Sequence, residues 1–273
     1  MPSKPLVYAH RGGAALRPEN TIVSFDHGLA LGADGLELDV RLSRDGVVVV
    51  HHDATLDRTT SGRGGLSDFT ADELARLDAG CRFQPPGAGA TEFPFQGQGI
   101  GVPRLRAVLT RYPSIPLIIE LKSNDPELAL RTVDELRLAG AVDRASLGSF
   151  YWRVLNAARE AEPRLRTGAS REETRWALYR SRLRWPIRHA AFQEFQVPEA
   201  VGRTTVVTPR FIAHAHRAGL PVKVWTVDDA EDMRRLIAWG VDALISDRPD
   251  IAVPVVKDSG LRAQGLGLRQ ERP

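Results

Sequence analysis

The chain has 273 residues, of which 42% are hydrophobic and 26% are charged. This balance is typical of a folded domain and excludes an intrinsically disordered protein, and no apolar run approaches the roughly 20 residues of a membrane helix. The formal net charge of +3 at pH 7 is too small to favour binding to nucleic acid.

Short apolar segments alternate with helix-period segments along almost the whole chain. The predicted strands cover 6–10, 35–40, 47–52, 116–122, 144–150, 164–170, 190–197, 220–227 and 242–247. The predicted helices cover 20–31, 70–78, 103–111, 126–139, 152–161, 172–183, 209–218 and 229–239. Strands that alternate with helices indicate βαβ units and a parallel sheet.

The strands at 35–40 and 47–52 are an exception, because only a tight turn separates them. Parallel strands cannot be joined in this way, so the second strand is expected to fold back antiparallel on the first. Eight strands then remain for a parallel set, which in a chain of this length predicts a (β/α)₈ TIM barrel. An open doubly wound sheet is the alternative, but the chain lacks a glycine-rich loop of the dinucleotide-binding type.

We expect a single barrel domain over residues 1–254 and a disordered tail over 255–273. A small loop-rich insertion region, about 54–102, follows the second barrel strand. Its segment 81–101 is rich in Gly and Pro, which predicts an inserted loop that covers one end of the barrel as a lid. Phe93 and Phe95 either touch an apolar part of a ligand or anchor this loop.

The hairpin, GLELDVRLSRDGVVVVHHD at 35–53, carries the first candidate site residues. Glu37 and Asp39 share one face of a strand, because side chains alternate. One turn register places His52 opposite Glu37 and another places it opposite Asp39. Either register aims His52 at the carboxylate face and turns His51 away from it.

Two carboxylates packed together repel each other, and a hard divalent cation relieves that repulsion. Glu120 ends the apolar run LIIELK and offers a third carboxylate, and Lys122 shares its face. Ligation by oxygen alone favours magnesium, calcium or manganese over zinc. Each carboxylate alone is typical of a strand end at the surface, whereas three at matching barrel positions predict a metal site.

The first strand ends in AHRGG and leads to RPENT. His10 and Arg11 at a strand end can reach the same mouth of the barrel. An arginine suits a phosphate group and a histidine suits proton transfer. Gly12 and Gly13 permit close approach of the backbone.

Together these motifs resemble the glycerophosphodiester phosphodiesterases. The resemblance runs over residues 7–251, through HRGG, RPENT, GLELDV, DGVVVVHHDATLDRTTSGRG, LIIELK and VKVWTVDD to GVDALISDRPD. It implies a (β/α)₈ barrel with a small insertion after the second strand. It also implies one divalent cation, Mg²⁺ or Ca²⁺, with Mn²⁺ as a further option.

The resemblance also implies roles for single residues. The implied metal ligands are Glu37, Asp39 and Glu120. The implied acid–base pair is His10 and His52, with Arg11 and Lys122 on the phosphate oxygens and Trp225 beside the substrate. Barrel packing is an equal alternative for Trp225. Weaker candidates are Glu19, Phe150 and Asp247; Glu194 and Gln196 are not assigned, and His27, His189, His214 and His216 are interpreted as structural or surface residues.

The leading functional hypothesis is metal-dependent hydrolysis of glycerophosphodiesters to glycerol 3-phosphate and an alcohol. A lysophospholipase D, which releases lysophosphatidic acid from lysophospholipids, is the alternative, because FQVPEAVGRTTVVTPRFIAHAHRAGLPVKVWTVDD resembles that branch of the family. A barrel that binds a phosphate ester without turnover is a less favoured hypothesis. The expected partner is thus a small molecule, with the oligomeric state left open.

Two further features concern location. The beginning MPSKPLVYAH lacks the pattern of a secretory signal, and Cys81 is the only cysteine, so a cytoplasmic protein is expected. The segment 164–188 interleaves arginines with Trp176, Leu183 and Trp185. It is interpreted as a solvated helix with one apolar face, and transient contact with an anionic membrane surface is the alternative.

Overall fold

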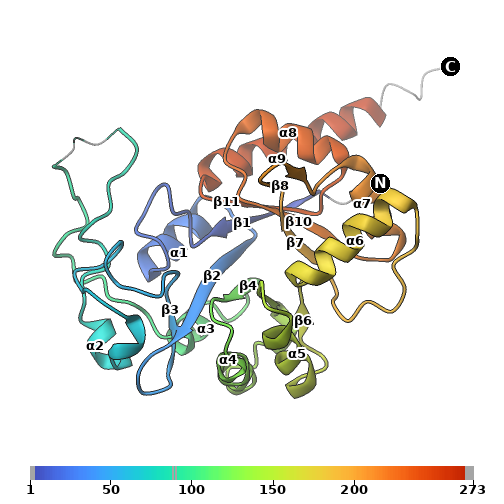
Figure 1. Ribbon diagram of the computed structural model, residues 1–273. Helices are drawn as coiled ribbons and strands as arrows, with labels where there is room; N and C mark the ends of the chain where they lie inside the picture. Colours follow the sequence, from blue (N-terminus) through green and yellow to red (C-terminus); the bar gives the residue numbers. More distant parts are fainter. Residues whose placement is uncertain (1–3, 88, 90, 268–273) are drawn as a thin grey trace.

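The computed structural model describes residues 4–87, 89 and 91–267, and its central feature is a ring of parallel strands with helices outside it (Figure 1). The strands are β1 (Leu6–His10), β2 (Gly35–Leu42), β4 (Leu117–Leu121), β5 (Ala145–Gly148), β6 (Arg166–Thr167), β7 (Phe195–Pro198), β10 (Val222–Trp225) and β11 (Ala243–Ser246). They pair in the order β6-β5-β4-β2-β1-β11-β10-β7, with every neighbouring pair parallel. A parallel bridge between Gly168 and Glu194 closes the ring. The predicted (β/α)₈ barrel is confirmed.

Helices lie outside the ring, and five of them begin at a residue whose side chain caps the first turn, namely Thr21, Asp125, Ser170, Thr208 and Asp229. The helices are α1 (Ile22–Ala30), α3 (Leu105–Arg111), α4 (Pro126–Leu138), α5 (Trp152–Ala161), α6 (Arg171–Leu183), α7 (Pro209–Arg217), α8 (Ala230–Trp239) and α9 (Pro249–Gly267), with a short 3₁₀ helix η2 (Val142–Arg144) before β5. The hydroxyl of Thr21 accepts the N–H of Ser24 at 3.2 Å, and that of Ser170 accepts the N–H of Glu173 at 3.2 Å. Such caps satisfy otherwise unpaired N–H groups, so they fix the first turn of α1 and α6 beside the barrel mouth.

Strand alternation divides the side chains between the core and the site. Leu36, Leu38 and Val40 of β2 are fully buried and belong to the main core between strands and helices. Glu37 and Asp39 lie between them in sequence and therefore point into the barrel. The same pattern in β4 leaves Glu120 inside.

The insertion begins with β3 (Val48–Val50), which pairs antiparallel with β2 as predicted. It continues through η1 (Leu66–Asp68) and α2 (Ala71–Ala75) and has a small core of its own, which includes Leu56, Leu66 and Leu74. In Figure 1 it lies on the opposite side of the barrel from α6. Phe95 packs on Phe83 with ring centroids 5.6 Å apart, so it anchors the loop.

Two peripheral segments differ from what the sequence predicts. Among the described residues, none of 81–101 lines the large cavity at the barrel mouth, so the lid stays a prediction. Helix α9 also extends past residue 255, where a disordered tail is predicted to begin. Val255 and Val256 are buried against the barrel core, and this burial stabilises the helix there. Residues 268–273 of the predicted tail lie outside the described residues.

A small hairpin after β7 is present in the structure but was not predicted from the sequence. It consists of β8 (Ala200–Val201) and β9 (Thr204–Thr205), which pair antiparallel. Its residues help to form the wall of the cavity. None of the helices that the structure describes is long and apolar enough to cross a membrane.

Candidate active site

A cavity of about 770 Å³ opens at the carboxyl ends of the barrel strands. This is the end at which TIM barrels place their sites, since the loops that follow the strands meet there. The cavity is lined by seven of the eight predicted site residues, namely His10, Arg11, Glu37, His52, Glu120, Lys122 and Trp225. The eighth, Asp39, is fully buried and forms ion pairs with two of them, Arg11 and Lys122. The structure thus brings all eight together.

Three carboxylates form an acidic cluster at the base of the cavity. Glu37, Asp39 and Glu120 each offer a ligand oxygen, and these oxygens lie within 4.8 Å of one another. Burial raises the pKa values of Glu37 and Glu120, because a charged carboxylate loses its hydration there. Burial acts on Asp39 in the same direction, but the charges of Arg11 and Lys122 outweigh it and lower the pKa of that carboxyl group.

The donor set of this acidic cluster fits a hard divalent cation. Oxygen atoms within 4.8 Å of one another can share an ion at the distances of about 2.0–2.6 Å that magnesium and calcium take. Asp39 Oδ1 is buried without a hydrogen-bond partner, so one ligand atom is left unsatisfied by the protein. Lys122 Nζ lies 3.4 Å from it and 3.0 Å from Glu120 Oε2, which places positive charge at the edge of the cluster. Glu37, Asp39 and Glu120 would therefore hold the cation.

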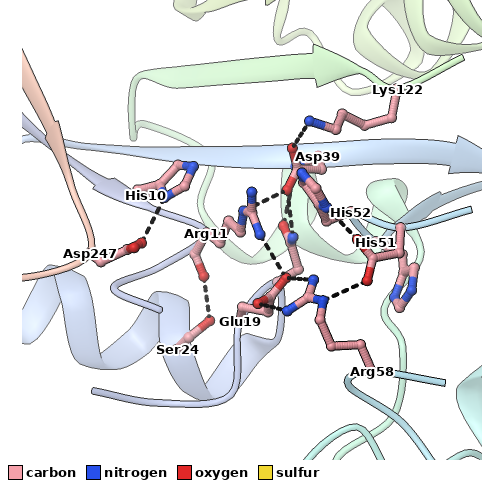
Figure 2. Close-up of polar contacts among 12 residues, drawn as sticks. His10, Arg11, Glu19, Ser24, Asp39, His51, His52, Arg58, Lys122 and Asp247 are labelled. Carbon is pink, nitrogen blue, oxygen red and sulfur yellow. Dashed lines mark hydrogen bonds and ion pairs between the residues drawn. The ribbon is translucent and has the colours of Figure 1, made fainter. Parts of the chain in front are cut away.

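His10 lies at the end of β1 with its ring between two carboxylates. Its Nδ1 is 2.6 Å from Asp247 Oδ1 (Figure 2). Its Nε2 is 3.7 Å from Glu37 Oε2. Burial alone would lower the pKa of this imidazole, but Glu37 and Asp247 together raise it to about 9. Asp247 holds Nδ1, so Nε2 is the atom presented to the cavity.

His52 reaches the site by a different route from the predicted one. Val40 pairs with Val50, so both registers considered from the sequence are wrong by one residue. The cause is a three-residue turn, Arg44 to Gly46, in which Gly46 has a φ of 73°. Continued pairing would place His51 opposite Asp39, but β3 ends at Val50, and His52 lines the cavity.

The two neighbouring histidines have different surroundings. His51 Nε2 lies 3.1 Å from the carbonyl oxygen of Thr55, away from the acidic cluster. His52 Nδ1 lies 2.6 Å from Asp53 Oδ1, which leaves Nε2 of this ring free as well. Burial lowers the pKa of His52. Each of the two site histidines thus has its Nδ1 held by a carboxylate.

A chain of alternating charges connects the two sides of the site (Figure 2). Arg11 Nε lies 3.1 Å from Asp39 Oδ2, and Arg11 Nη1 donates to Glu19 Oε1 at 3.0 Å. Arg58 donates to both oxygens of Glu19, at 2.6 and 2.8 Å, and to Asp53 Oδ2 at 2.6 Å. Through these contacts the loop after β1 and the insertion hold Arg11 and the partner of His52 in fixed positions.

Three residues of the site were not predicted: Asn20, Asp53 and Arg58. The side-chain amide of Asn20 donates to Asp39 Oδ2 at 2.8 Å, and its oxygen accepts the backbone N–H of Asp39 at 3.1 Å. All three lie inside the motifs RPENT and HHDATLDR, beside residues that were weighed. That position is the only signal for Asn20 and Arg58, because their contacts with Asp39 and Glu19 span 19 and 39 residues of sequence.

Some of the weaker candidates contact residues of the site, and others do not. Glu19 and Asp247 hold Arg11 and His10, and Phe150 packs edge-to-face on Trp225 with ring centroids 6.0 Å apart. Glu194 is buried in the barrel, where Lys223 Nζ lies 2.7 Å from its Oε1. The residues described as lining the cavity include Gln196 but none of His27, His189, His214 and His216.

Comparison with known proteins gives a consistent result. Residues 10–251 match the model of the glycerophosphoryl diester phosphodiesterase family. The chain is 33% identical over 262 residues to a glycerophosphodiester phosphodiesterase of Caldanaerobacter subterraneus subsp. tengcongensis, covering 94% of this chain and 100% of the relative. A crystal structure of a glycerophosphodiester phosphodiesterase from Agrobacterium tumefaciens is similar with a TM-score of 0.73 and 30% identity, covering 91% of this chain and 98% of that one. An Oleispira antarctica phosphodiesterase in complex with the product sn-glycerol-3-phosphate is similar with a TM-score of 0.74 and 26% identity, covering 93% and 97%.

Proposed function

Because the chain belongs to the glycerophosphoryl diester phosphodiesterase family, we propose that it hydrolyses glycerophosphodiesters to sn-glycerol 3-phosphate and an alcohol. One observation carries this proposal. His10 and His52 both line a cavity above the acidic cluster, and each has its Nδ1 held by a carboxylate. This arrangement presents two Nε2 atoms to one substrate, as general acid–base chemistry requires.

The residues divide the reaction between them. One histidine accepts the proton of the nucleophile, which is water or the neighbouring glycerol hydroxyl, as its oxygen bonds to phosphorus. The other donates a proton to the alcohol oxygen as the bond between this oxygen and phosphorus breaks. Where the glycerol hydroxyl attacks, the product of this step is a cyclic phosphate, which water then opens to give sn-glycerol 3-phosphate. Arg11 and Lys122 stabilise the charge that develops on the phosphate oxygens. A cation held by the acidic cluster, Mg²⁺ or Ca²⁺ with Mn²⁺ as a further option, would polarise the phosphoryl group.

The products of glycerophosphocholine test this function. With magnesium or calcium, the purified protein is expected to release choline and sn-glycerol 3-phosphate. The phosphorus-containing product is identified by ³¹P NMR. Phosphocholine as the phosphorus-containing product would show that the other ester bond is cleaved and would contradict the proposal. No product with either cation would favour the barrel that binds without turnover.

The cavity favours a second candidate function, lysophospholipase D activity. Beyond the polar base, α6, the end of β7 and the β8–β9 hairpin form a side wall of the cavity, and a group of apolar residues in this wall makes an apolar arm. The apolar residues of this arm include Leu178, Val197, Pro198, Val201 and Val206. Glycerol is polar and choline is charged, so neither has a long apolar chain to bury against this surface. An acyl chain gains about 0.8 kcal/mol for each buried CH₂ group. The arm thus suits a lysophospholipid.

Leu178→Asn tests this arm. We expect kcat/KM for a monomeric lysophosphatidylcholine to fall by about tenfold or more, because the amide removes apolar contact and must itself be solvated. Turnover of glycerophosphocholine should not change, since Leu178 lies on α6, outside the polar base with the two histidines and the acidic cluster. Leu138→Asn, at an exposed position of α4, is the matched control. Equal losses on both substrates would refute the role of the arm.

A further inference from the structure

Helix α6 presents a second stripe of side chains beside the one that lines the cavity. The cavity stripe consists of Arg171, Thr174, Arg175 and Leu178. Next to it on the helix lie Trp176, Tyr179 and Leu183, which are 65%, 53% and 60% exposed. Trp185, just after the helix, is 64% exposed. Trp176 and Tyr179 contact each other, with ring centroids 6.3 Å apart.

Exposed apolar side chains are concentrated at this side of the cavity. Eleven large hydrophobic residues are exposed in the described part of the chain, and eight of them lie in 150–152, 176–185 and at 201. Phe150, α6 and the β8–β9 hairpin are all walls of the cavity. Single exposed apolar residues are ordinary, but a group of this size marks an interaction surface.

The charge of the segment indicates what this surface meets. Residues 174–193 contain five arginines and no Asp or Glu. Arg182, Arg184 and Arg188 are exposed, and none of them forms an ion pair with any residue that the structure describes. Arginine binds phosphate through its planar group, and its stem covers apolar surface. A surface with aromatic side chains between unpaired arginines complements anionic phospholipid headgroups.

We propose that the α6 surface, formed by Trp176, Tyr179, Leu183, Trp185 and the arginines at 182 and 184, docks on an anionic phospholipid bilayer. The aromatic rings enter the interface and the arginines contact lipid phosphates. The α6 surface adjoins the helix stripe that lines the apolar arm of the cavity, so a lipid substrate enters that arm from the bilayer. Only this last step rests on the proposed function.

Vesicle sedimentation tests the docking without turnover. The full chain is expected to sediment with vesicles of equimolar phosphatidylglycerol and phosphatidylcholine, and not with phosphatidylcholine alone. Arg182→Gln combined with Arg184→Gln should lower binding by about tenfold or more, at roughly 1 kcal/mol for each arginine. Trp176→Ser combined with Tyr179→Ser should also weaken binding. Leu138→Asn and Arg131→Gln, on α4, should bind like the unaltered chain.

Other outcomes would overturn the proposal. Sedimentation that is absent, or equal in the α6 variants and the controls, would show that the α6 surface does not bind membranes. A dimer in lipid-free buffer that dissociates on Trp176→Ser with Tyr179→Ser would show that a second copy covers it. None of the four altered α6 residues lines the cavity, so these variants should turn over glycerophosphocholine normally. If the unaltered chain does not hydrolyse glycerophosphocholine, the result counts against the proposed function and not against the docking surface.

Discussion

His52→Ala is expected to lower kcat for glycerophosphocholine by about 10²–10⁴-fold, the usual contribution of a general acid or base. The alanine removes the imidazole whose Nε2 faces the cavity and leaves Asp53 bound to Arg58. The fold and cation binding should persist, because His52 belongs to neither the hydrophobic core nor the acidic cluster. Steady-state kinetics together with thermal unfolding measure both effects.

His51→Gln is the matched control, because this neighbouring residue points to the Thr55 carbonyl and the new amide keeps a donor for it. Its activity should stay close to that of the unaltered protein. A large loss in His51→Gln with little loss in His52→Ala would reverse the assignment of the two residues.

Removal of divalent cations with a chelator is expected to lower turnover by about 100-fold or more, because several kcal/mol of charge stabilisation are lost. Magnesium or calcium should restore it. The same cation should raise the melting temperature, since it relieves the repulsion among Glu37, Asp39 and Glu120. At a concentration of about 100 Kd the stabilisation is about 2.7 kcal/mol.

Glu37→Gln separates binding at this cluster from binding elsewhere. The amide oxygen can still accept the backbone N–H of Arg11, a contact of 3.0 Å in the structure, but one ligand charge is lost. The cation-dependent rise in melting temperature should shrink strongly in this variant. The same rise in melting temperature should persist in Glu127→Gln, which alters an exposed carboxylate of α4. Equal shifts in both variants would place the cation at another site.

The sequence was sufficient for the architecture because period and spacing carry that information. Strands that alternate with helices predicted the barrel, and the position of Glu37, Asp39 and Glu120 at strand ends predicted their convergence. The residues GLELDV show why: Leu36, Leu38 and Val40 pack outward, so the two carboxylates that alternate with them must face inward.

What the sequence could not predict depends on details of turns and on long-range contacts. The observed hairpin register differs by one residue from each predicted register, because Gly46 adopts a left-handed conformation in a three-residue turn. His52 nevertheless reaches the site, because β3 ends two residues before it. Arg58 contacts Glu19 across 39 residues of sequence, and no periodic pattern encodes such a contact.

The cavity wall was also beyond sequence reasoning. The loop at 81–101 was expected to cover the barrel mouth, but the residues described there do not line the cavity. The wall comes instead from α6 and a hairpin formed by Ala200–Val201 and Thr204–Thr205, whose strands are too short to show alternation. The residues that form this wall are therefore visible only in the folded chain.

In the proposed reaction, the two histidines and the acidic cluster promote cleavage of the bond between phosphorus and the alcohol oxygen. Hydrolysis of glycerophosphocholine in H₂¹⁸O, followed by mass spectrometry of both products, shows which bond breaks. We expect cation-dependent formation of ¹⁸O-labelled sn-glycerol 3-phosphate together with unlabelled choline. Label in choline would instead show cleavage of the carbon–oxygen bond and would rule out attack at phosphorus.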